Sequence, residues 1–186
     1  MAGHSPDVTA AVSIPVRDAQ PDFDTLYEEH VDVVWRLLQR FGVPEAGLED
    51  AVQDVFIVAH RQLAGFRGES SLKTWLHAIA HKVAKDYRRK EQRKGGWLEL
   101  EPTMADPGRS PHEAAAQRQQ LEAVLRLLEA MEETQRTVFV LTEFQGMTAP
   151  EIAEVMGSSV NTVSSRLRAA RQRFNELVAA DSEGAR

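Results

Sequence analysis

The stretch from Thr148 to Phe174 constrains the fold of this chain most strongly, because it predicts two short helices separated by a tight turn. Thr148 and Glu151 have the spacing of a capping box, in which each side chain bonds the backbone amide of the other. Gly157 can end the first helix in a left-handed conformation. From Val160 onward, apolar residues recur at the helical period through Phe174, which predicts a second, amphipathic helix.

The face of this second helix opposite its apolar stripe carries hydroxyl, amide and guanidinium groups. Residues 160–175 include no acidic residue, so the face is positively charged. Such groups bond base edges and phosphates, and an α-helix fits the major groove of DNA. We therefore interpret the stretch as a helix-turn-helix with Val160 to Phe174 as recognition helix. The candidate DNA contacts are Ser158, Ser159, Asn161, Thr162, Ser164, Ser165, Arg166, Arg168 and Arg171. An ordinary helical hairpin with a solvated basic face is the alternative.

The bulk composition limits the class of protein. The 186 residues carry a net charge of -6, so the basic residues act locally and the chain as a whole is not a cationic nucleic-acid binder. Cysteine is absent, which excludes disulfides and thiol chemistry. No apolar run approaches the roughly 20 residues of a membrane-spanning helix, and the first ten residues lack a signal pattern. We expect a cytoplasmic protein without direct membrane insertion.

Three earlier segments also have helical periodicity, and they predict helices at about residues 22–40, 44–63 and 71–93. The outer face of the second of these helices carries Asp50, Gln53 and Asp54 around one aliphatic residue, Ile57. A polar surface with one exposed aliphatic residue is compatible with a protein-binding site. Single exposed apolar residues are also common on ordinary surfaces, so the pattern alone leaves both interpretations open.

The third of these helices has a row of histidines and cations opposite its apolar stripe. His77, His81, Lys85 and Arg88 form the row, and Lys73, Lys82 and Arg89 flank it. An exposed face of this kind suits a phosphate-lined partner. His77 and His81 also have the spacing of two metal ligands, but no third ligand accompanies them, so we expect no metal site. Trp75 falls on the apolar side, which favours core packing over base stacking.

The chain is therefore predicted to be all-α, with two small helical domains joined by a flexible linker. The first domain spans residues 22–93 and follows a tail of residues 1–21. Glycines and prolines break the helical pattern in the linker, residues 94–111. The second domain spans residues 112–180, with helices from His112 to about Met131 and from about Glu133 to Phe144 before the helix-turn-helix. Residues 181–186 form a short polar tail.

Several motifs occur together in one order and spacing. They are AGLEDAVQDVFIVAH, FRGESSLKTWLHAIAHKVAKDYRRK, a linker rich in proline and glycine, and ETQRTVFVLTEFQGMTAPEIAEVMGSSVNTVSSRLRAARQRF. This combination resembles a bacterial RNA polymerase sigma factor of the extracytoplasmic-function (ECF) group. The resemblance implies a dissociable specificity subunit of RNA polymerase with a region 2 domain and a region 4 domain. It also implies an initiation factor that is not an enzyme and needs no cofactor or small-molecule substrate.

The resemblance also implies roles for residues. The helix from Leu48 to Leu63 would bind the clamp helices of the largest polymerase subunit through Asp50, Gln53, Asp54 and Ile57. The loop from Phe66 to Ser71 and the helix after it would contact the -10 promoter element through Phe66, Arg67, Ser70, Lys73, His77, His81, Lys82, Lys85, Arg88 and Arg89. The recognition helix would read the -35 element. Many family members have Arg-Asn at His81-Lys82, so the -10 preference is not implied.

Further partners follow from the same resemblance. Core polymerase would also be contacted at its flap region, and an anti-sigma factor is expected as an inhibitor. The competing hypothesis is a stand-alone helix-turn-helix transcriptional regulator, which explains residues 148–174 but not the second helix or the basic row of the third. A third hypothesis is an enzyme. Only His77 and His81 support it, because no phosphate-binding loop or catalytic triad is present.

Overall fold

The computed structural model describes residues 22–94 and 111–184, and every regular element in this part of the chain is an α-helix. The helices are α1 (Phe23–Arg40), α2 (Glu45–Leu63), α3 (Leu72–Lys94), α4 (Pro111–Glu129), α5 (Glu133–Glu143), α6 (Ala149–Met156) and α7 (Val160–Gly184). The all-α prediction is confirmed. The predicted tail of residues 1–21 and almost the whole predicted linker lie outside the described residues.

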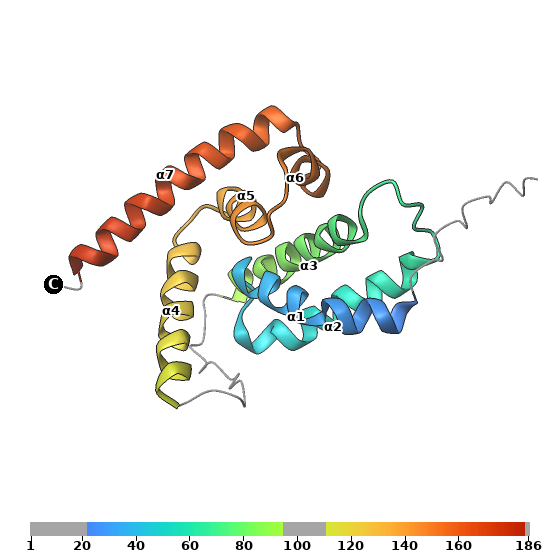
Figure 1. The fold of residues 1–186 in the computed structure, drawn as a ribbon, viewed down its shortest axis with the longest axis horizontal. Helices are drawn as coiled ribbons and strands as arrows, with labels where there is room; N and C mark the ends of the chain where they lie inside the picture. The colour runs from blue at the N-terminus through green and yellow to red at the C-terminus, as the bar shows by residue number, and fades with distance from the viewer. Residues whose placement is uncertain (1–21, 95–110, 185–186) are drawn as a thin grey trace, which may run out of the picture.

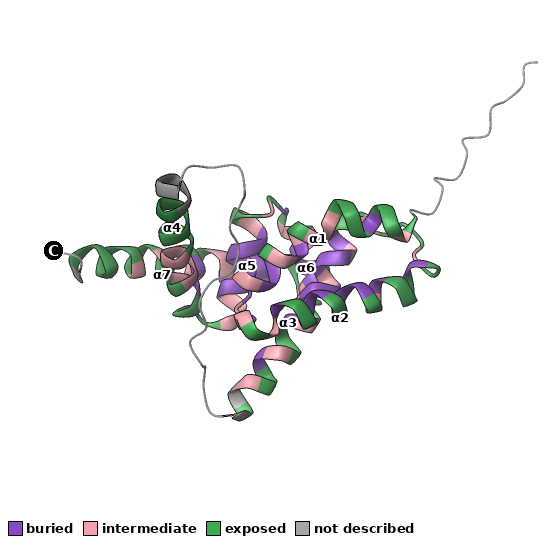
Figure 2. Cartoon of the chain, turned by 90° about the horizontal axis from the view of Figure 1, so that it is seen from below, coloured by how far each residue is buried: buried purple, intermediate pink, exposed green. Residues whose placement is uncertain are grey.

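The helices form two groups (Figure 1). In the first group α1, α2 and α3 pack against one another, with Val34, Leu38 and Val55 wholly buried between them. In the second group α5 and α6 pack against α7, and α4 also contacts α7. Figure 2 shows α5 buried along much of its length, which is why it serves as the central helix of this group.

The turn of the helix-turn-helix forms as its sequence predicts. The capping box at Thr148 is present, and the Glu151 carboxylate accepts a bond of 2.8 Å from the Thr148 backbone N–H. Gly157 ends α6 at φ 59° and ψ 42°, the left-handed conformation that glycine adopts without steric cost. Ser159 then caps α7 by accepting a bond of 3.1 Å from the Thr162 N–H.

Two details of α7 differ from the prediction. The helix does not end near Phe174 but continues to Gly184, into the stretch assigned to a polar tail. Val160 was placed in the buried stripe, and this placement is wrong because the residue is 43% exposed. It is the first helical residue after the turn, so no neighbouring helix covers it. Val163 and Ala170, one and three turns further on, are buried as predicted.

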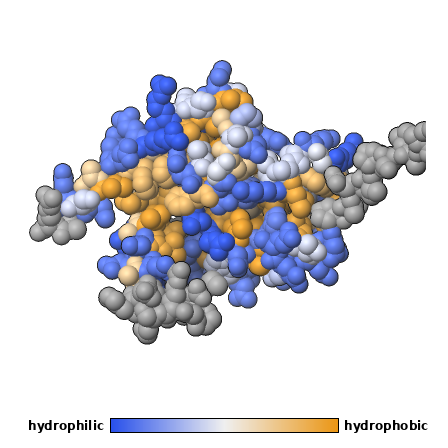
Figure 3. Space-filling view, in the orientation of Figure 1, coloured by the Kyte–Doolittle hydropathy of each residue, from blue (hydrophilic) through white to orange (hydrophobic). Residues whose placement is uncertain are grey.

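The two groups also pack on each other. Helix α3 lies against α6, and α1 contacts α4, so the second group covers part of the face of α3 that the sequence assigned to solvent (Figure 1). In the same view, apolar side chains remain visible along the line where α4 meets α7 (Figure 3). Leu121 of α4 and Val178 of α7 are each 38% exposed.

Candidate nucleic-acid and polymerase interfaces

The first half of α7 presents the polar face that its sequence predicts. Asn161, Ser164, Ser165 and Arg168 are exposed. The two serine hydroxyls donate to carbonyl oxygens within the helix, Ser164 to Val160 at 3.0 Å and Ser165 to Thr162 at 3.0 Å. These bonds hold the hydroxyls against the helix while leaving their lone pairs accessible. The centre of this face therefore combines the hydroxyl acceptors of Ser164 and Ser165, the amide of Asn161 and the guanidinium of Arg168.

Three other predicted contacts are partly engaged within the protein. The Ser159 and Thr162 hydroxyl oxygens lie 2.8 Å apart at the start of α7, where they form its cap. Ser158 was proposed as a surface contact, but its hydroxyl oxygen is buried and has no hydrogen-bond partner within the described part of the chain. The residue as a whole is half-buried, and its contact with DNA stays a prediction.

An acidic residue outside α7 neutralises part of its basic face. Glu143, at the end of α5, forms an ion pair of 2.7 Å with Arg171 and also accepts a bond of 2.8 Å from its Nε. This pair could not be predicted from the sequence of the recognition helix, because that helix has no acidic residue of its own in its first half. Arg168 is fully on the exposed side, and Arg166 is half-buried. Arg168 is therefore the guanidinium best placed to meet a base edge.

The outer face of α2 has the exposure that its pattern predicts for three of four residues. Asp50 and Gln53 are exposed, and Ile57 is 39% exposed. Asp54 is half-buried and accepts a hydrogen bond of 2.9 Å from the Tyr87 hydroxyl. Burial, this hydrogen bond and the Asp54 charge raise the pKa of Tyr87 to about 12. Asp54 thus ties α2 to α3 as well as facing outward.

Ile57 lies at the edge of an apolar groove between α1 and α2. The groove encloses about 820 Å³ and is lined by Phe23, Tyr27, Val31, Trp35, Glu49, Val52, Gln53, Phe56, Ile57, His60 and Arg61. Tyr27 is 42% exposed and packs edge-on against Phe56, with ring centroids 4.7 Å apart. Tyr27 has the helical spacing of a core residue, so the periodicity of the sequence does not predict this groove.

A second hollow lies at the start of α3 and is more polar. It encloses about 540 Å³ between Arg61, Gln62, Gly65, Phe66, Arg67, Glu69, Ser70, Trp75 and, from α6, Glu154. The structure therefore brings Phe66, Arg67 and Ser70 together as predicted. Trp75 is half-buried and contacts Phe66 at 5.2 Å between ring centroids. It packs against the edge of the core, as predicted, and also lines this hollow.

The basic row of α3 is divided by the second group of helices. Lys73, Lys82, Lys85 and Arg89 are exposed. His77 is only 1% exposed and Arg88 only 6%, so their predicted placement on a solvent face is wrong in this structure. The reason is tertiary: α5 and α6 cover this side of α3. His77 Nδ1 lies 3.2 Å from the Met147 sulfur, and His81 packs against the Phe41 ring.

Both histidines have strongly lowered pKa values. For His77, burial and then the nearby Lys73 and His30 lower the pKa to about 4, against a smaller opposing effect of Glu151. For His81, burial and Arg88 lower the pKa to about 4. Neutral imidazoles are the stable form here, because a buried cation beside other cations is unfavourable.

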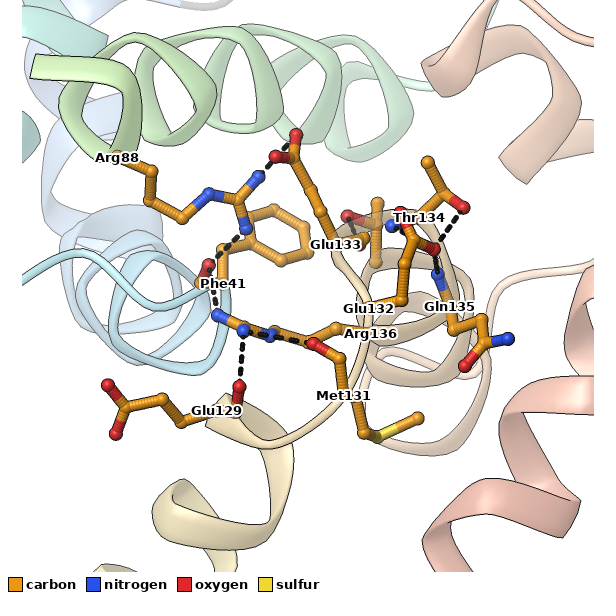
Figure 4. Close-up of polar contacts among 10 residues, drawn as sticks. Phe41, Arg88, Glu129, Met131, Glu132, Glu133, Thr134, Gln135 and Arg136 are labelled. Atoms are coloured by element: carbon orange, nitrogen blue, oxygen red, sulfur yellow. Dashed lines mark hydrogen bonds and ion pairs between the residues drawn. The ribbon is translucent and has the colours of Figure 1, made fainter. Parts of the chain in front are cut away.

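Two guanidiniums meet where α1 ends (Figure 4). Arg88 donates to the Phe41 carbonyl oxygen at 2.5 Å and forms an ion pair of 2.6 Å with Glu133. Arg136 donates to the same carbonyl at 3.2 Å, and to the backbone of Glu129 and Met131 at 2.9 and 3.2 Å. Gly42, at φ +83°, allows this approach, since a Cβ there would lie 2.0 Å from the Arg136 Nη1 atom.

Within residues 22–94 and 111–184, no three His, Cys, Asp or Glu side chains are grouped closely enough to hold a metal ion. None of the helices in these ranges combines the length and apolar character needed to cross a membrane. The candidate surfaces described above are the exposed face of α7, the groove between α1 and α2, and the hollow at the start of α3.

Comparison with known proteins identifies the family to which this chain belongs. Residues 26–94 match Sigma-70 region 2, and residues 121–174 match Sigma-70, region 4. The chain is 33% identical over 172 residues to RNA polymerase sigma factor CnrH of Cupriavidus metallidurans, covering 88% of this chain and 90% of the relative. It is 31% identical over 168 residues to the ECF RNA polymerase sigma-E factor of Escherichia coli K12, covering 86% and 87%.

Solved structures agree with the sequence relatives. The structure of CnrH in complex with the cytosolic domain of CnrY matches with a TM-score of 0.66 and 30% identity, covering 86% of this chain and 88% of that one. The sigma factor RpoE of Bartonella quintana, solved with the anti-sigma factor NepR, has the same fold, with a TM-score of 0.70 at 23% identity.

The chain belongs to the sigma-70 family, as an ECF-type RNA polymerase sigma factor with regions 2 and 4. It directs RNA polymerase to promoters through these two regions, binds DNA through the region 4 helix-turn-helix, and is a non-catalytic initiation factor. The α1–α3 group contains region 2, and the helix-turn-helix of α6 and α7 lies in region 4. The predicted family is confirmed, and the stand-alone regulator is not, because a region 2 match is not part of such a protein.

Proposed function

We propose that the groove between α1 and α2 is the surface that binds the clamp helices of the largest polymerase subunit. The observation that carries this proposal is an apolar hollow rimmed by exposed polar side chains, with Tyr27 and Ile57 both about two-fifths exposed. An amphipathic helix inserts apolar side chains into a groove of this kind and meets polar groups at its rim. Asp50 and Gln53 supply that rim.

The promoter contacts in this proposal divide between the two regions. The exposed face of α7 reads the -35 element in the major groove, with Arg168 and Asn161 as base contacts. The hollow beside Phe66, Arg67 and Trp75 receives an unstacked base of the -10 element, because it offers aromatic surface next to a guanidinium. Lys73, Lys82, Lys85 and Arg89 supply phosphate contacts along α3.

A protein inhibitor is part of the same proposal. CnrH, of which the chain covers 90%, was solved in complex with the cytosolic domain of CnrY. We infer that an anti-sigma factor holds this chain in an analogous complex, and that the flap region of polymerase contacts region 4 when the inhibitor leaves. Because polymerase and promoters are in the bacterial cytoplasm, we infer that this chain acts there. The domain limits at residues 22–93 and 112–180 belong to the proposal too.

The assignment is tested by transcription in vitro from fragmented genomic DNA. Core polymerase is used with and without the protein, and the 5′ ends of the RNA are mapped. Start sites that depend on the protein and share two spaced upstream motifs support the promoter assignments. Protein-dependent DNA binding without polymerase, together with no new start sites, contradicts them.

The groove is tested separately by Ile57→Glu. A carboxylate in an apolar contact loses its hydration without gaining a partner, so affinity for core polymerase should fall about tenfold or more. Ala46→Glu is the matched control, because Ala46 is exposed on the same helix and does not line the groove. Equal polymerase affinities for both variants would remove the groove from the interface.

A further inference from the structure

Tyr87 joins the second half of α3 to the outer face of α2. Its hydroxyl donates a hydrogen bond of 2.9 Å to Oδ2 of Asp54. Its ring lies against Gly47, where a Cβ atom would come within 3.2 Å of the Tyr87 Cδ1 atom. The Lys90 ammonium lies 4.9 Å from the centre of the same ring, a distance at which a cation and an aromatic face attract each other. These three contacts together fix where the Tyr87 hydroxyl lies.

The Asp54 carboxylate has a second carboxylate as its neighbour. Asp50 precedes Asp54 by four residues on α2, so both side chains lie on one side of the helix. Burial, the hydrogen bond to Asp54 and the charges of Asp54 and Asp50 together raise the pKa of Tyr87 to about 12. The hydroxyl therefore keeps its proton at neutral pH, and it lies close to both carboxylates. Like charges at this spacing repel each other, so a donor or a cation that approaches the pair stabilises it.

The two carboxylates stand beside the groove that the proposed function assigns to the clamp helices. Glu49 and Gln53, their neighbours in the chain, both line that groove. The bond from Tyr87 uses one oxygen of Asp54, and a carboxylate has a second oxygen that can accept another donor. A carboxylate already held in one orientation loses less conformational freedom when a partner binds. A fixed Asp54 therefore gives a higher affinity than a rotating one.

We propose that Tyr87 is a positioning residue for polymerase binding: its hydroxyl holds the Asp54 carboxylate beside Asp50, and the pair receives a cationic side chain of the clamp helices. This inference rests on the proposed function, which places those helices in the adjacent groove. Tyr87 acts on the interface through Asp54. The groove supplies the apolar part of the interface, and the two carboxylates supply a charged part that fixes the register of the bound helices.

The hydroxyl is tested by Tyr87→Phe in the full-length protein. Phenylalanine keeps the ring but removes the hydrogen bond, so affinity for core polymerase should fall about three- to tenfold. Asp54→Asn should also weaken binding, because an amide carries no charge. The double variant should bind no more weakly than Asp54→Asn alone, since the hydroxyl acts only through this carboxylate. Losses that add in the double variant would overturn the proposal.

Gly47→Ala is a second test that leaves the hydroxyl and the carboxylate in place. The added Cβ would displace the Tyr87 ring by a few tenths of an ångström, so the hydrogen bond is misplaced and affinity should fall about twofold. Alanine favours a helix more than glycine does, so we expect no loss of stability in α2. In the Tyr87→Phe background the same change should alter affinity no further. An equal loss in both backgrounds would assign the effect to ring packing instead of the hydrogen bond.

The charge of the partner is tested by salt. Affinity for core polymerase should fall as the salt concentration rises, and it should fall less for Asp54→Asn, because one charge of the pair is gone. An identical salt dependence in the two proteins would overturn the cationic partner.

Thr74→Val is the control for stability. Thr74 is buried, and its hydroxyl oxygen lies 2.8 Å from that of Ser71 at the opposite end of α3. Losing this bond should lower the free energy of unfolding without changing polymerase affinity. Denaturant unfolding of every variant shows how much stability each has lost. If Thr74→Val and Tyr87→Phe lose affinity alike at a similar loss of stability, the role of Tyr87 is structural and the proposal is overturned.

The outcomes separate this inference from the proposed function. Wild-type affinity in Tyr87→Phe overturns the positioning role. If Ile57→Glu still weakens binding in that case, the groove stands and only the positioning role fails. If neither variant weakens binding, the proposed interface fails as well. A loss in Tyr87→Phe without one in Ile57→Glu supports the carboxylate pair and removes the groove.

Discussion

At the residue scale, His77 and Arg88 lie on a helix face that is polar in sequence and buried in the folded chain. Each has one partner from region 4: His77 contacts the Met147 sulfur, and Arg88 pairs with Glu133. Their neighbours Lys73 and Lys82 remain exposed. The same row of side chains therefore contains groups that are exposed and groups that residues of region 4 cover.

The lowered pKa of His77 predicts a loss of stability in acid. Its pKa is about 4 in the folded protein, against an ordinary 6.5. Between these two pH values, His77 is therefore protonated in the unfolded chain and neutral in the folded chain. Stability is complete above pH 6.5 and falls as the pH falls, by about 2 kcal/mol at pH 5 for this group alone. The charged groups facing it are Lys73 on its own helix, His30 from α1 and Glu151 from α6.

Denaturant unfolding at pH 7.5 and pH 5 measures this effect. The free energy of unfolding of His77→Gln should change less between the two pH values than that of the wild-type protein. The reason is that glutamine, unlike His77, takes up no proton on unfolding. An identical pH dependence in both proteins would show that His77 is not held neutral by its surroundings.

Arg168 predicts a change in promoter preference. It is exposed on the central face of α7, and the described structure shows its neighbour Arg171 already paired with Glu143. Arg168→Ala should therefore weaken transcription and relax the preference at one position of the -35 element, by about 1–3 kcal/mol of discrimination. Competition between promoter variants measures this. An equal loss on all promoters would make Arg168 a phosphate contact instead.

At the element scale, the turn between α6 and α7 sets the direction of the recognition helix. The capping box at Thr148 begins α6, Gly157 ends it, and Ser159 begins α7. Each of these signals acts within a few residues of sequence, which is why the motif forms as predicted. Helix α7 extends beyond the DNA-facing part because Phe174 and Leu177 still pack against the core of region 4.

Gly157 predicts a backbone effect on stability. An added Cβ would meet no atom within 4 Å, so Gly157→Ala creates no clash and its cost is the left-handed conformation itself. We expect a loss of about 1 kcal/mol in the free energy of unfolding. Gly157→Asn should lose less, because asparagine adopts this conformation more readily. Equal stabilities for the alanine and asparagine variants would contradict this account.

At the scale of the whole molecule, an acidic chain carries its cations on specific surfaces. The net charge is -6, yet residues 160–175 contain no acidic residue. The fold places two glutamates beside basic residues of other helices: Glu143 pairs with Arg171, and Glu133 pairs with Arg88. Both glutamates belong to α5, which contacts α7 and lies next to α3. The packing of α5 therefore neutralises one arginine on α3 and one on α7.

Glu143→Gln tests this distribution of charge. The change frees the Arg171 guanidinium for one more phosphate, so the logarithmic salt dependence of promoter binding by the holoenzyme should become steeper by about 0.9. Glu183→Gln removes the same charge from the exposed end of α7 and is the control. Promoter affinity is measured at several salt concentrations. An unchanged slope, or the same change in the control, would exclude Arg171 as a phosphate contact.

Much of the fold follows from local sequence. The start of α5 at Glu133, the end of α2 at Leu63 and the turn at Gly157 agree with their predicted places. The exposed polar face of α7 also follows, because helical phasing shows which side of a helix lacks apolar residues. The groove between α1 and α2 did not follow, since Tyr27 has the spacing of a core residue and only packing shows that it lies at the core's edge.

The sequence by itself determined the helices, their caps, the helix-turn-helix and the family, because periodicity and capping act over a few residues and motif order is written along the chain. The tertiary structure alone decided which polar groups are free. His77 and Arg88 are buried because Met147 and Glu133, which lie far along the chain, pack against them. Phasing relates a side chain to its own helix, and it contains no information about a second domain that packs on the same face.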